Sequence, residues 1–192
     1  MKLYPNELFH IYNRGNNRQT LFFDRDNYLY FLEKVKEYVK PHSEIIAWCL
    51  MPNHFHFLIY IPPDKDSKDL SKGIQIILRS YTRAINKQKN RTGSLFTQNT
   101  CSKVLVDNSV VQPNRYTTTC FHYIHQNPMK AGLVKNMEDW EFSSFKDYIG
   151  LRKGKLINRE LANTFINISE DRQQFYEDAY RVINESLLDK IF

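Results

Sequence analysis

The sequence predicts an α+β fold in which an antiparallel β-sheet carries helices on one face and is followed by a C-terminal helical extension. Two observations lead to this prediction. The expected elements follow the order β-α-β-β-α-β and then α, which is the split βαβ order of ferredoxin-like (RRM-like) folds. Around position 55, polar and bulky apolar residues alternate with period two, as in a strand with two different faces. Such a sheet leaves its other face available to hold a strand of nucleic acid.

Length and composition indicate one domain with an appendage. The chain has 192 residues, 42% of them hydrophobic, which is enough to fold around a core. We place the main domain at residues 1–150 and a helical extension at 151–192, with 151–155 as the linker between them.

Cysteine usage and hydropathy indicate where the protein works. The three cysteines lack the paired spacing of a metal site and are too few for a disulfide framework, which fits a reducing compartment. No apolar run approaches the roughly 20 residues that span a bilayer, and the N-terminus lacks the apolar core of a signal peptide. We therefore expect a cytoplasmic protein with no membrane partner.

The first strand and the first helix are expected before residue 42. Residues 8–13 are rich in aromatic and β-branched side chains, which favours a strand, and a polar loop follows. Asp24 or Asp26 can cap a helix over 26–40, and Pro41 ends it.

Two further strands are expected at residues 44–50 and 54–61. Pro52 and Asn53 separate them, and both residue types suit a tight turn because Pro presets φ and Asn tolerates unusual backbone angles. We therefore expect a hairpin whose second strand begins at His54.

The second expected helix, at residues 69–89, has two contrasting faces. On a helical projection of 100° per residue, its apolar residues form one stripe toward the core. The opposite face carries four basic residues with no acid among them: Lys72, Arg79, Arg83 and Lys87. The segment 70–106 contains seven basic residues and no acid, while the whole chain has a net charge of +6. This face is expected to contact nucleic acid or, as the alternative, to be an ordinary solvated surface.

The later elements are a strand at 103–106 and a helix at 116–126. Pro128 disfavours the helical conformation of the residue before it, so the helix is expected to end near Asn127. Beyond the linker, residues 160–192 form the helical extension, with helical spacing of these apolar residues: Phe175, Ala179, Val182 or Ile183, and Leu187.

Two short patterns carry candidate chemistry. On a strand, His54 and His56 project from one face and Phe55 from the other, so the imidazoles could share one metal ion. Alone, this His-x-His pattern is a weak signal that more often marks two structural or exposed histidines than a metal site. On a helix, Tyr123 and Asn127 stand at i and i+4 on one face, so a phenol and an amide would point together at a neighbouring element.

Several motifs in the same order resemble a known family. They are Asn13-Arg14-Gly15, Met51-Pro52-Asn53-His54-Phe55-His56, Tyr123-Ile124-His125-Gln126-Asn127-Pro128, Lys130-Ala131-Gly132-Leu133 and Trp140-Glu141-Phe142-Ser143-Ser144. Over about residues 8–150 the sequence resembles the single-tyrosine HUH transposases (IS200-like), and within them the REP-associated branch. These enzymes cut and rejoin single-stranded DNA.

The resemblance implies an activity and a set of site residues. Tyr123 would attack a phosphodiester and form a 5′-phosphotyrosine, leaving a free 3′-hydroxyl. His54, His56 and Asn127 would hold a divalent ion, Mg²⁺ or Mn²⁺, and Gln126 is the alternative third ligand. The DNA partner would be a single strand with a hairpin. Arg14 and the basic helix face would contact it.

Some alternatives stay open at this point. The fold and basic helix could belong to a domesticated protein that binds single-stranded nucleic acid without cutting it. A zinc hydrolase using His54 and His56 would need a third strong ligand, and no His-Glu-x-x-His motif supplies one. Relatives that act as dimers can supply the tyrosine from the partner chain, so a homodimer also stays open.

Residues of the same types elsewhere receive other interpretations. Tyr116 and Tyr148 become rival nucleophiles only where Tyr123 is buried. Four histidines are interpreted as structural: His10, His42, His122 and His125.

Overall fold

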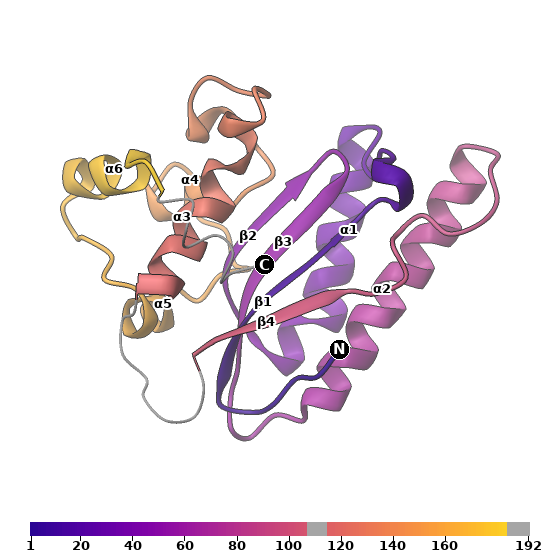
Figure 1. Ribbon diagram of the computed structural model, residues 1–192, viewed down its shortest axis with the longest axis horizontal. Coiled ribbons are helices and arrows are strands. Elements are labelled where there is room, and N and C mark those ends of the chain that lie inside the picture. The colour runs from indigo at the N-terminus through magenta and orange to yellow at the C-terminus, as the bar shows by residue number, and fades with distance from the viewer. Residues whose placement is uncertain (107–114, 184–192) are drawn as a thin grey trace.

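The computed structural model describes residues 1–106 and 115–183 and has a four-stranded antiparallel sheet at its centre (Figure 1). The strands stand in the order β2-β3-β1-β4, which is the order of a ferredoxin-like sheet. Their bounds are β1 Glu7–Arg14, β2 Glu44–Met51, β3 His54–Ile61 and β4 Cys101–Val106. The predicted fold class is confirmed.

Two helices cover one face of the sheet. They are α1, Arg25–Tyr38, capped by the Asp24 side chain, and α2, Ser67–Gln88, capped by Asp66. Their buried residues pack with Phe55 and other apolar side chains that point to this face of the sheet. The predicted apolar stripe of the second helix is confirmed, because its members are buried or half-buried: Leu70, Ile74, Ile77, Leu78, Tyr81 and Ile85.

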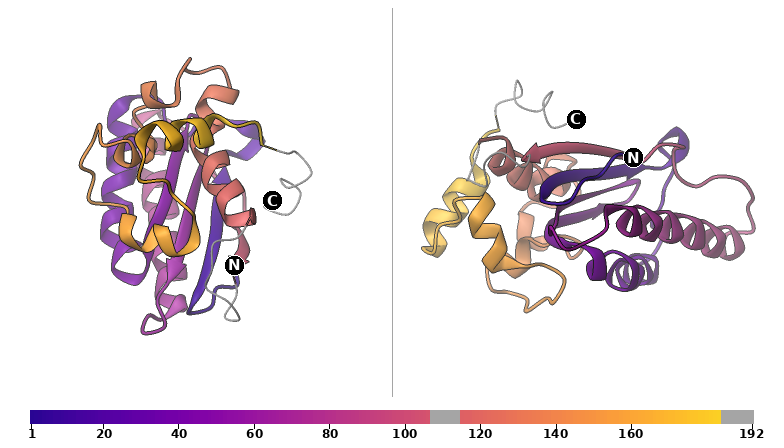
Figure 2. Two further views of the ribbon diagram at one scale, coloured as in Figure 1. Left: turned by 90° about the vertical axis from the view of Figure 1, so that its left-hand side faces the viewer. Right: turned by 90° about the horizontal axis from the view of Figure 1, so that it is seen from below.

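A second layer packs against the other face, on its β2 side (Figure 2). It contains α3, Arg115–Lys130, α4, Phe145–Tyr148, α5, Arg159–Phe165, and α6, Arg172–Tyr180. Apolar residues of these helices share one core with residues of β2 and β3 such as Leu58. The face expected to be open is therefore partly covered, which narrows the space where a ligand could reach the sheet.

Helix α3 is longer than the sequence predicts. It continues through Pro128 to Lys130, so the expected end near Asn127 is wrong. The proline removes one backbone hydrogen-bond donor from the helix, but Pro128 is buried. After Lys130 the chain turns at Gly132, whose φ of +70° allows the amides of Gly132 and Leu133 to bond back to the last turn of the helix.

The C-terminal part contains two separate helices, α5 and α6. α6 ends at Tyr180, and Val182 is 96% exposed whereas Ile183 is buried. The predicted position Leu187 lies outside the described residues. The boundary at residue 150 stays a prediction.

Short 3₁₀ helices occupy Asn16–Arg18, Lys40–His42 and Met137–Asp139.

Within residues 1–106 and 115–183, no helix combines the length and apolar character needed to cross a bilayer.

Candidate active site

The pairing of β1 with β3 brings five polar side chains onto the sheet face opposite α1 and α2. Tyr12 stands directly across from His56, and Arg14 across from His54. His10 lies two residues before Tyr12 and therefore projects from the same face. The alternate residues point the other way into the apolar core, which anchors both strands rigidly.

The hairpin that starts β3 is held by the loop after β1. Met51 pairs with His54, so Pro52 and Asn53 form the predicted tight turn. The Gly15 amide donates to the Asn53 carbonyl at 2.8 Å. A Cβ at Gly15 would lie 2.0 Å from the Gln19 carbonyl oxygen, so this close passage of the backbone needs glycine.

Asn13 is a structural member of the Asn13-Arg14-Gly15 motif. It is 2% exposed, and its amide donates to the Thr100 hydroxyl at 2.9 Å while accepting from Thr97 at 2.7 Å. These bonds tie β1 to the loop before β4. Arg14, next to it, is exposed at the rim of the site, and its contact with DNA stays a prediction.

Both histidines of β3 are engaged through Nδ1. Nδ1 of His54 lies 2.7 Å from Oδ1 of Asn53, and Nδ1 of His56 lies 2.9 Å from Nε2 of His10. The two β3 rings are 4.9 Å apart between centroids and nearly perpendicular. A metal ligated by these histidines would therefore be bound through their Nε2 atoms.

Burial keeps these imidazoles neutral. It lowers the pKa of His56 well below its usual range, and the neighbouring His10 and His54 act in the same direction. Burial also lowers the pKa of His54, although the Asn127 amide partly opposes this effect. Neutral imidazole is the form that binds metal ions.

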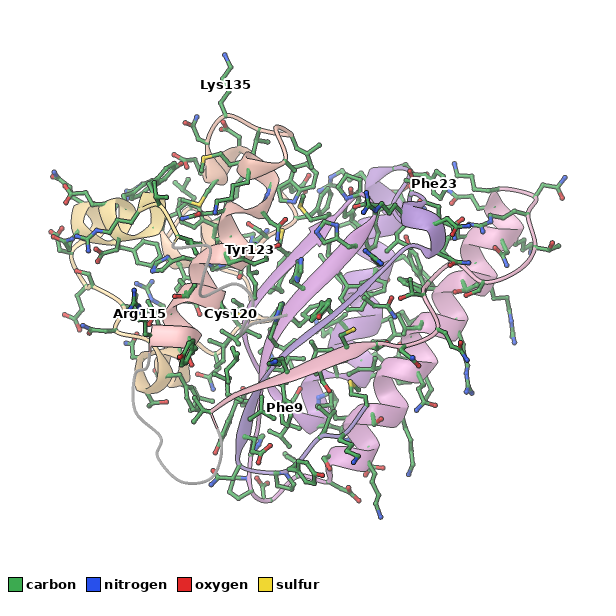
Figure 3. The ribbon with its side chains drawn as sticks, viewed as in Figure 1. Phe9, Phe23, Arg115, Cys120, Tyr123 and Lys135 are labelled. Atoms are coloured by element: carbon green, nitrogen blue, oxygen red, sulfur yellow. The ribbon has the colours of Figure 1, made fainter. Side chains whose placement is uncertain are left out.

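Tyr123 stands on α3 beside the sheet (Figure 3). Its ring meets the His56 ring edge to face, with centroids 5.7 Å apart. Burial raises the pKa of its phenol, and the Asn127 side chain acts in the opposite direction. Asn127 thus interacts with both Tyr123 and His54, so the structure brings together the four residues expected at the reaction centre.

The alternative third ligand, Gln126, is directed elsewhere. Its amide donates to the carbonyl of Ala179 at 2.6 Å and to that of Arg181 at 2.9 Å. These bonds attach the end of α6 to α3. Of the two amide side chains proposed as the third ligand, only that of Asn127 lies beside the histidines.

The rival tyrosines are not in this site. Tyr148 is 3% exposed, and its hydroxyl donates to the Ile46 carbonyl inside the core. Tyr116 lies in the first turn of α3, almost two turns before Tyr123, and does not line the pocket.

The candidate site contains a pocket of about 320 Å³. Its walls are formed by Tyr12, Asn13, Arg14, Arg18, Asn53, His54, His56 and Tyr123. Two arginines and no carboxylate are among these described lining residues, so the pocket suits an anion. Sequence reasoning missed Tyr12, Arg18 and Asn53. The period-two alternation of β1 could have indicated Tyr12.

The donor set fits a divalent ion with open coordination positions. Within the described residues no three His, Cys, Asp or Glu side chains come together as a metal site. The pocket instead offers two imidazoles, and Asn127, which interacts with His54, adds an amide whose side-chain oxygen can ligate a cation. A set of two nitrogens and one amide oxygen leaves several positions for water or phosphate oxygens.

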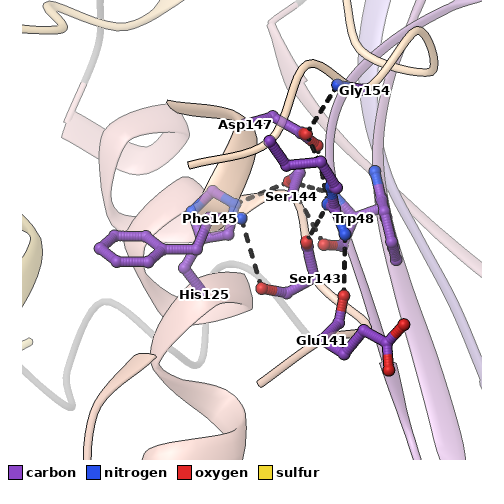
Figure 4. Close-up of polar contacts among 9 residues, drawn as sticks. Trp48, His125, Glu141, Ser143, Ser144, Phe145, Asp147 and Gly154 are labelled. Atoms are coloured by element: carbon purple, nitrogen blue, oxygen red, sulfur yellow. Dashed lines mark hydrogen bonds and ion pairs between the residues drawn. The ribbon is translucent and has the colours of Figure 1, made fainter. Parts of the chain in front are cut away.

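A polar network fixes α3 to β2 (Figure 4). Nε2 of His125 lies 2.7 Å from the Ser144 hydroxyl, which accepts from the Trp48 amide at 2.9 Å. Arg152 makes a two-pronged ion pair with Asp147, whose side chain is 4% exposed. His125 is thus structural, as the sequence analysis expected, and its anchoring also holds Tyr123 at a defined distance from β3.

The basic face of α2 lies on the other side of the sheet from the pocket. All four of its basic residues are exposed, but the expectation that no acid lies among them is wrong, because Asp69 pairs with Lys72 at 3.0 Å. Across residues 1–106 and 115–183, no carboxylate lies within 4 Å of Arg79, Arg83 or Lys87. The structure does not bring this face and the pocket together.

Comparison with known proteins identifies the family. A family model described as "Transposase IS200 like" matches residues 5–127, which include β1 to β4 and α3 as far as Asn127. The chain therefore belongs to the IS200-like transposase family.

Individual relatives agree with this assignment. The chain is 26% identical over 111 residues to a candidate REP-associated tyrosine transposase of Haemophilus influenzae and 31% identical over 102 residues to a REP-associated tyrosine transposase of Escherichia coli K12. Each match covers 53% of this chain and only 58% or 54% of the relative, so the chain matches a little over half of their length.

A solved structure shares the fold. It is that of a REP-associated tyrosine transposase bound to a REP hairpin, with a TM-score of 0.60 and 20% identity over 96% of this chain and 100% of that one. At this identity the likeness establishes the fold alone.

Proposed function

We propose that the protein is a metal-dependent single-stranded DNA endonuclease and strand transferase that recognises hairpin DNA of the REP type. The observation that carries the proposal is the placement of Tyr123 against His56, in a pocket with two arginines and no carboxylate among its described lining residues. Membership of the IS200-like transposase family supports it. The hairpin substrate in this proposal rests on the relatives. Two of them are named REP-associated tyrosine transposases, and a solved structure with this fold is bound to a REP hairpin.

In the reaction, the Tyr123 oxygen attacks the phosphorus of a phosphodiester. The new bond joins the phenol to the 5′-phosphate, the bond to the 3′ oxygen breaks, and the phenolic proton ends on that 3′-hydroxyl. One phosphate ester replaces another, so the reverse attack by a 3′-hydroxyl can rejoin strands without an external energy source.

Several residues in and beside the pocket have roles in this step. Arg14 and Arg18 bind the phosphate charge, and the Asn127 amide opposes the rise in pKa that burial imposes on Tyr123. His54, His56 and Asn127 would hold Mg²⁺ or Mn²⁺. When bound there, the ion supplies Lewis-acid polarisation of the phosphate oxygens.

A cleavage assay tests this function. A labelled oligonucleotide with a hairpin and single-stranded flanks, incubated with protein and Mn²⁺, is expected to give a shortened product and a protein adduct that survives a denaturing gel. Adding EDTA should remove both. Binding without an adduct on any hairpin of a broad library, each with varied flanks, would instead identify the non-cutting binding protein.

We further propose that the exposed face of Arg79, Arg83 and Lys87 contacts phosphates of the hairpin arm rather than of the strand in the pocket, because it lies on the opposite side of the sheet. Replacing all three with Gln should weaken hairpin binding and reduce the slope of log affinity against log salt by about two to three, since fewer counterions are released.

The matched substrate is a short oligonucleotide without a hairpin, whose binding to the triple variant should be nearly unchanged. Fluorescence anisotropy at several salt concentrations measures both affinities. An unchanged slope for the hairpin would mean that the face is only solvated.

A further inference from the structure

His10 lies directly beside His56 on the neighbouring strand. A hydrogen bond of 2.9 Å joins Nε2 of His10 to Nδ1 of His56, and the ring centroids are 5.1 Å apart. His10 is completely buried, and Tyr12 stacks on its ring at 4.8 Å. The His10 ring is thus held between Tyr12 and His56 in one orientation.

A hydrogen bond between two imidazole nitrogens contains one proton and has two arrangements. With the proton on Nδ1 of His56, the Nε2 of that ring carries a lone pair and can ligate a metal. With the proton on Nε2 of His10, neutral His56 must carry its own proton on Nε2 and cannot ligate through it. The group that is hydrogen-bonded to Nδ1 of His56 therefore decides whether Nε2 of His56 can ligate a metal.

The other histidine of β3 has a partner without this ambiguity. Nδ1 of His54 lies 2.7 Å from the side-chain oxygen of Asn53, which can only accept. His54 is therefore protonated on Nδ1. A shared ion on both Nε2 atoms requires the same tautomer at His56, and His10 is the residue placed to impose it.

We propose that His10 is a positioning residue whose Nε2 accepts the Nδ1 proton of His56 and so presents Nε2 of His56 to a divalent ion. The proposal rests on the metal site of the proposed function and adds a residue that the family motifs used above do not contain. His10 touches neither the ion nor the DNA. It acts through the tautomer and orientation of one ligand.

Two substitutions at His10 separate this role from simple packing. His10→Leu fills the buried site without an acceptor, whereas the side-chain oxygen of His10→Gln can accept from Nδ1 of His56. In calorimetric titrations with Mn²⁺, His10→Leu should bind about 10–100-fold more weakly than the wild type, the usual effect of losing an outer partner of a ligand. His10→Gln should recover most of that affinity. A packing role alone would lower the unfolding temperature of both variants without separating their affinities.

A second readout needs no metal. Long-range ¹H–¹⁵N NMR of the metal-free protein reports which imidazole nitrogen carries the proton. The wild type and His10→Gln should show His56 protonated on Nδ1, and His10→Leu should show the Nε2 tautomer or a mixture. If His10→Leu does not fold, His10→Asn gives the same comparison, because its shorter side chain withdraws the acceptor.

The outcomes distinguish the two proposals. An unchanged tautomer and an unchanged Mn²⁺ affinity in the folded acceptor-free variant would overturn the role of His10. A wild type that shows the Nδ1 tautomer but binds no Mn²⁺ would overturn the metal assignment of the proposed function, while the tautomer data would still support the control of His56 by His10.

Discussion

Replacing Tyr123 with phenylalanine is expected to abolish the covalent protein–DNA adduct while leaving hairpin binding intact. The change removes only the phenolic oxygen, so the ring contact with His56 remains. Loss of a nucleophile lowers cleavage by a factor on the order of 10⁴ or more, whereas loss of one hydrogen bond costs about 1 kcal/mol of stability. Adduct yield on a denaturing gel and affinity by anisotropy measure the two effects separately.

Tyr116→Phe is the matched control, because it removes a hydroxyl from the same helix outside the pocket. It should form the adduct at the wild-type rate. An adduct that persists in Tyr123→Phe would place the nucleophile elsewhere, and Tyr12, which lines the same pocket, would be the first residue to test.

Replacing His56 with alanine is expected to remove the divalent-ion site. His56 is 3% exposed and projects into the pocket beside His54. Losing an outer partner of a ligand weakens metal binding by about 10–100-fold, so losing the ligand itself should exceed 100-fold. Calorimetric titration with Mn²⁺ measures the affinity, and the cleavage assay should show a parallel loss.

His42→Ala is the control for this change, because His42 does not line the pocket and lies in a short 3₁₀ helix just before the end of β2 that pairs with Tyr60, not with His54. Its Mn²⁺ isotherm should match the wild type. Equal isotherms for His56→Ala and wild type would refute the assignment of His54 and His56 as ligands.

The sequence predicts best those elements whose local pattern and packing agree. The bounds 54–61 of the third strand agree with the structure, because alternating residues face two different environments. The second helix is predicted at 69–89 and found at Ser67–Gln88, since its apolar stripe matches one buried face. In both cases, a short stretch contains the information that positions it.

The parts that sequence reasoning missed depend on contacts between distant segments. Tyr12 enters the pocket only because the register of β1 sets it across from His56. The direction of Gln126 depends on the carbonyls at the end of α6, more than 50 residues later. Helix α3 continues through Pro128, although a proline locally favours the end of a helix. Burial of Pro128 and the hydrogen bonds of the Gly132 and Leu133 amides to the last turn offset the backbone hydrogen bond that the proline removes.

Identification of the residue that carries the DNA tests the central claim most directly. After reaction with Mn²⁺ and a hairpin oligonucleotide, digestion with trypsin and nuclease leaves a peptide from α3 with a nucleotide attached, and fragmentation in a mass spectrometer locates it. The account predicts a 5′-phosphate linked to Tyr123 and no modified peptide from the Tyr123→Phe variant. A nucleotide on Tyr12 or Tyr116, or cleaved DNA without any modified tyrosine, would contradict it.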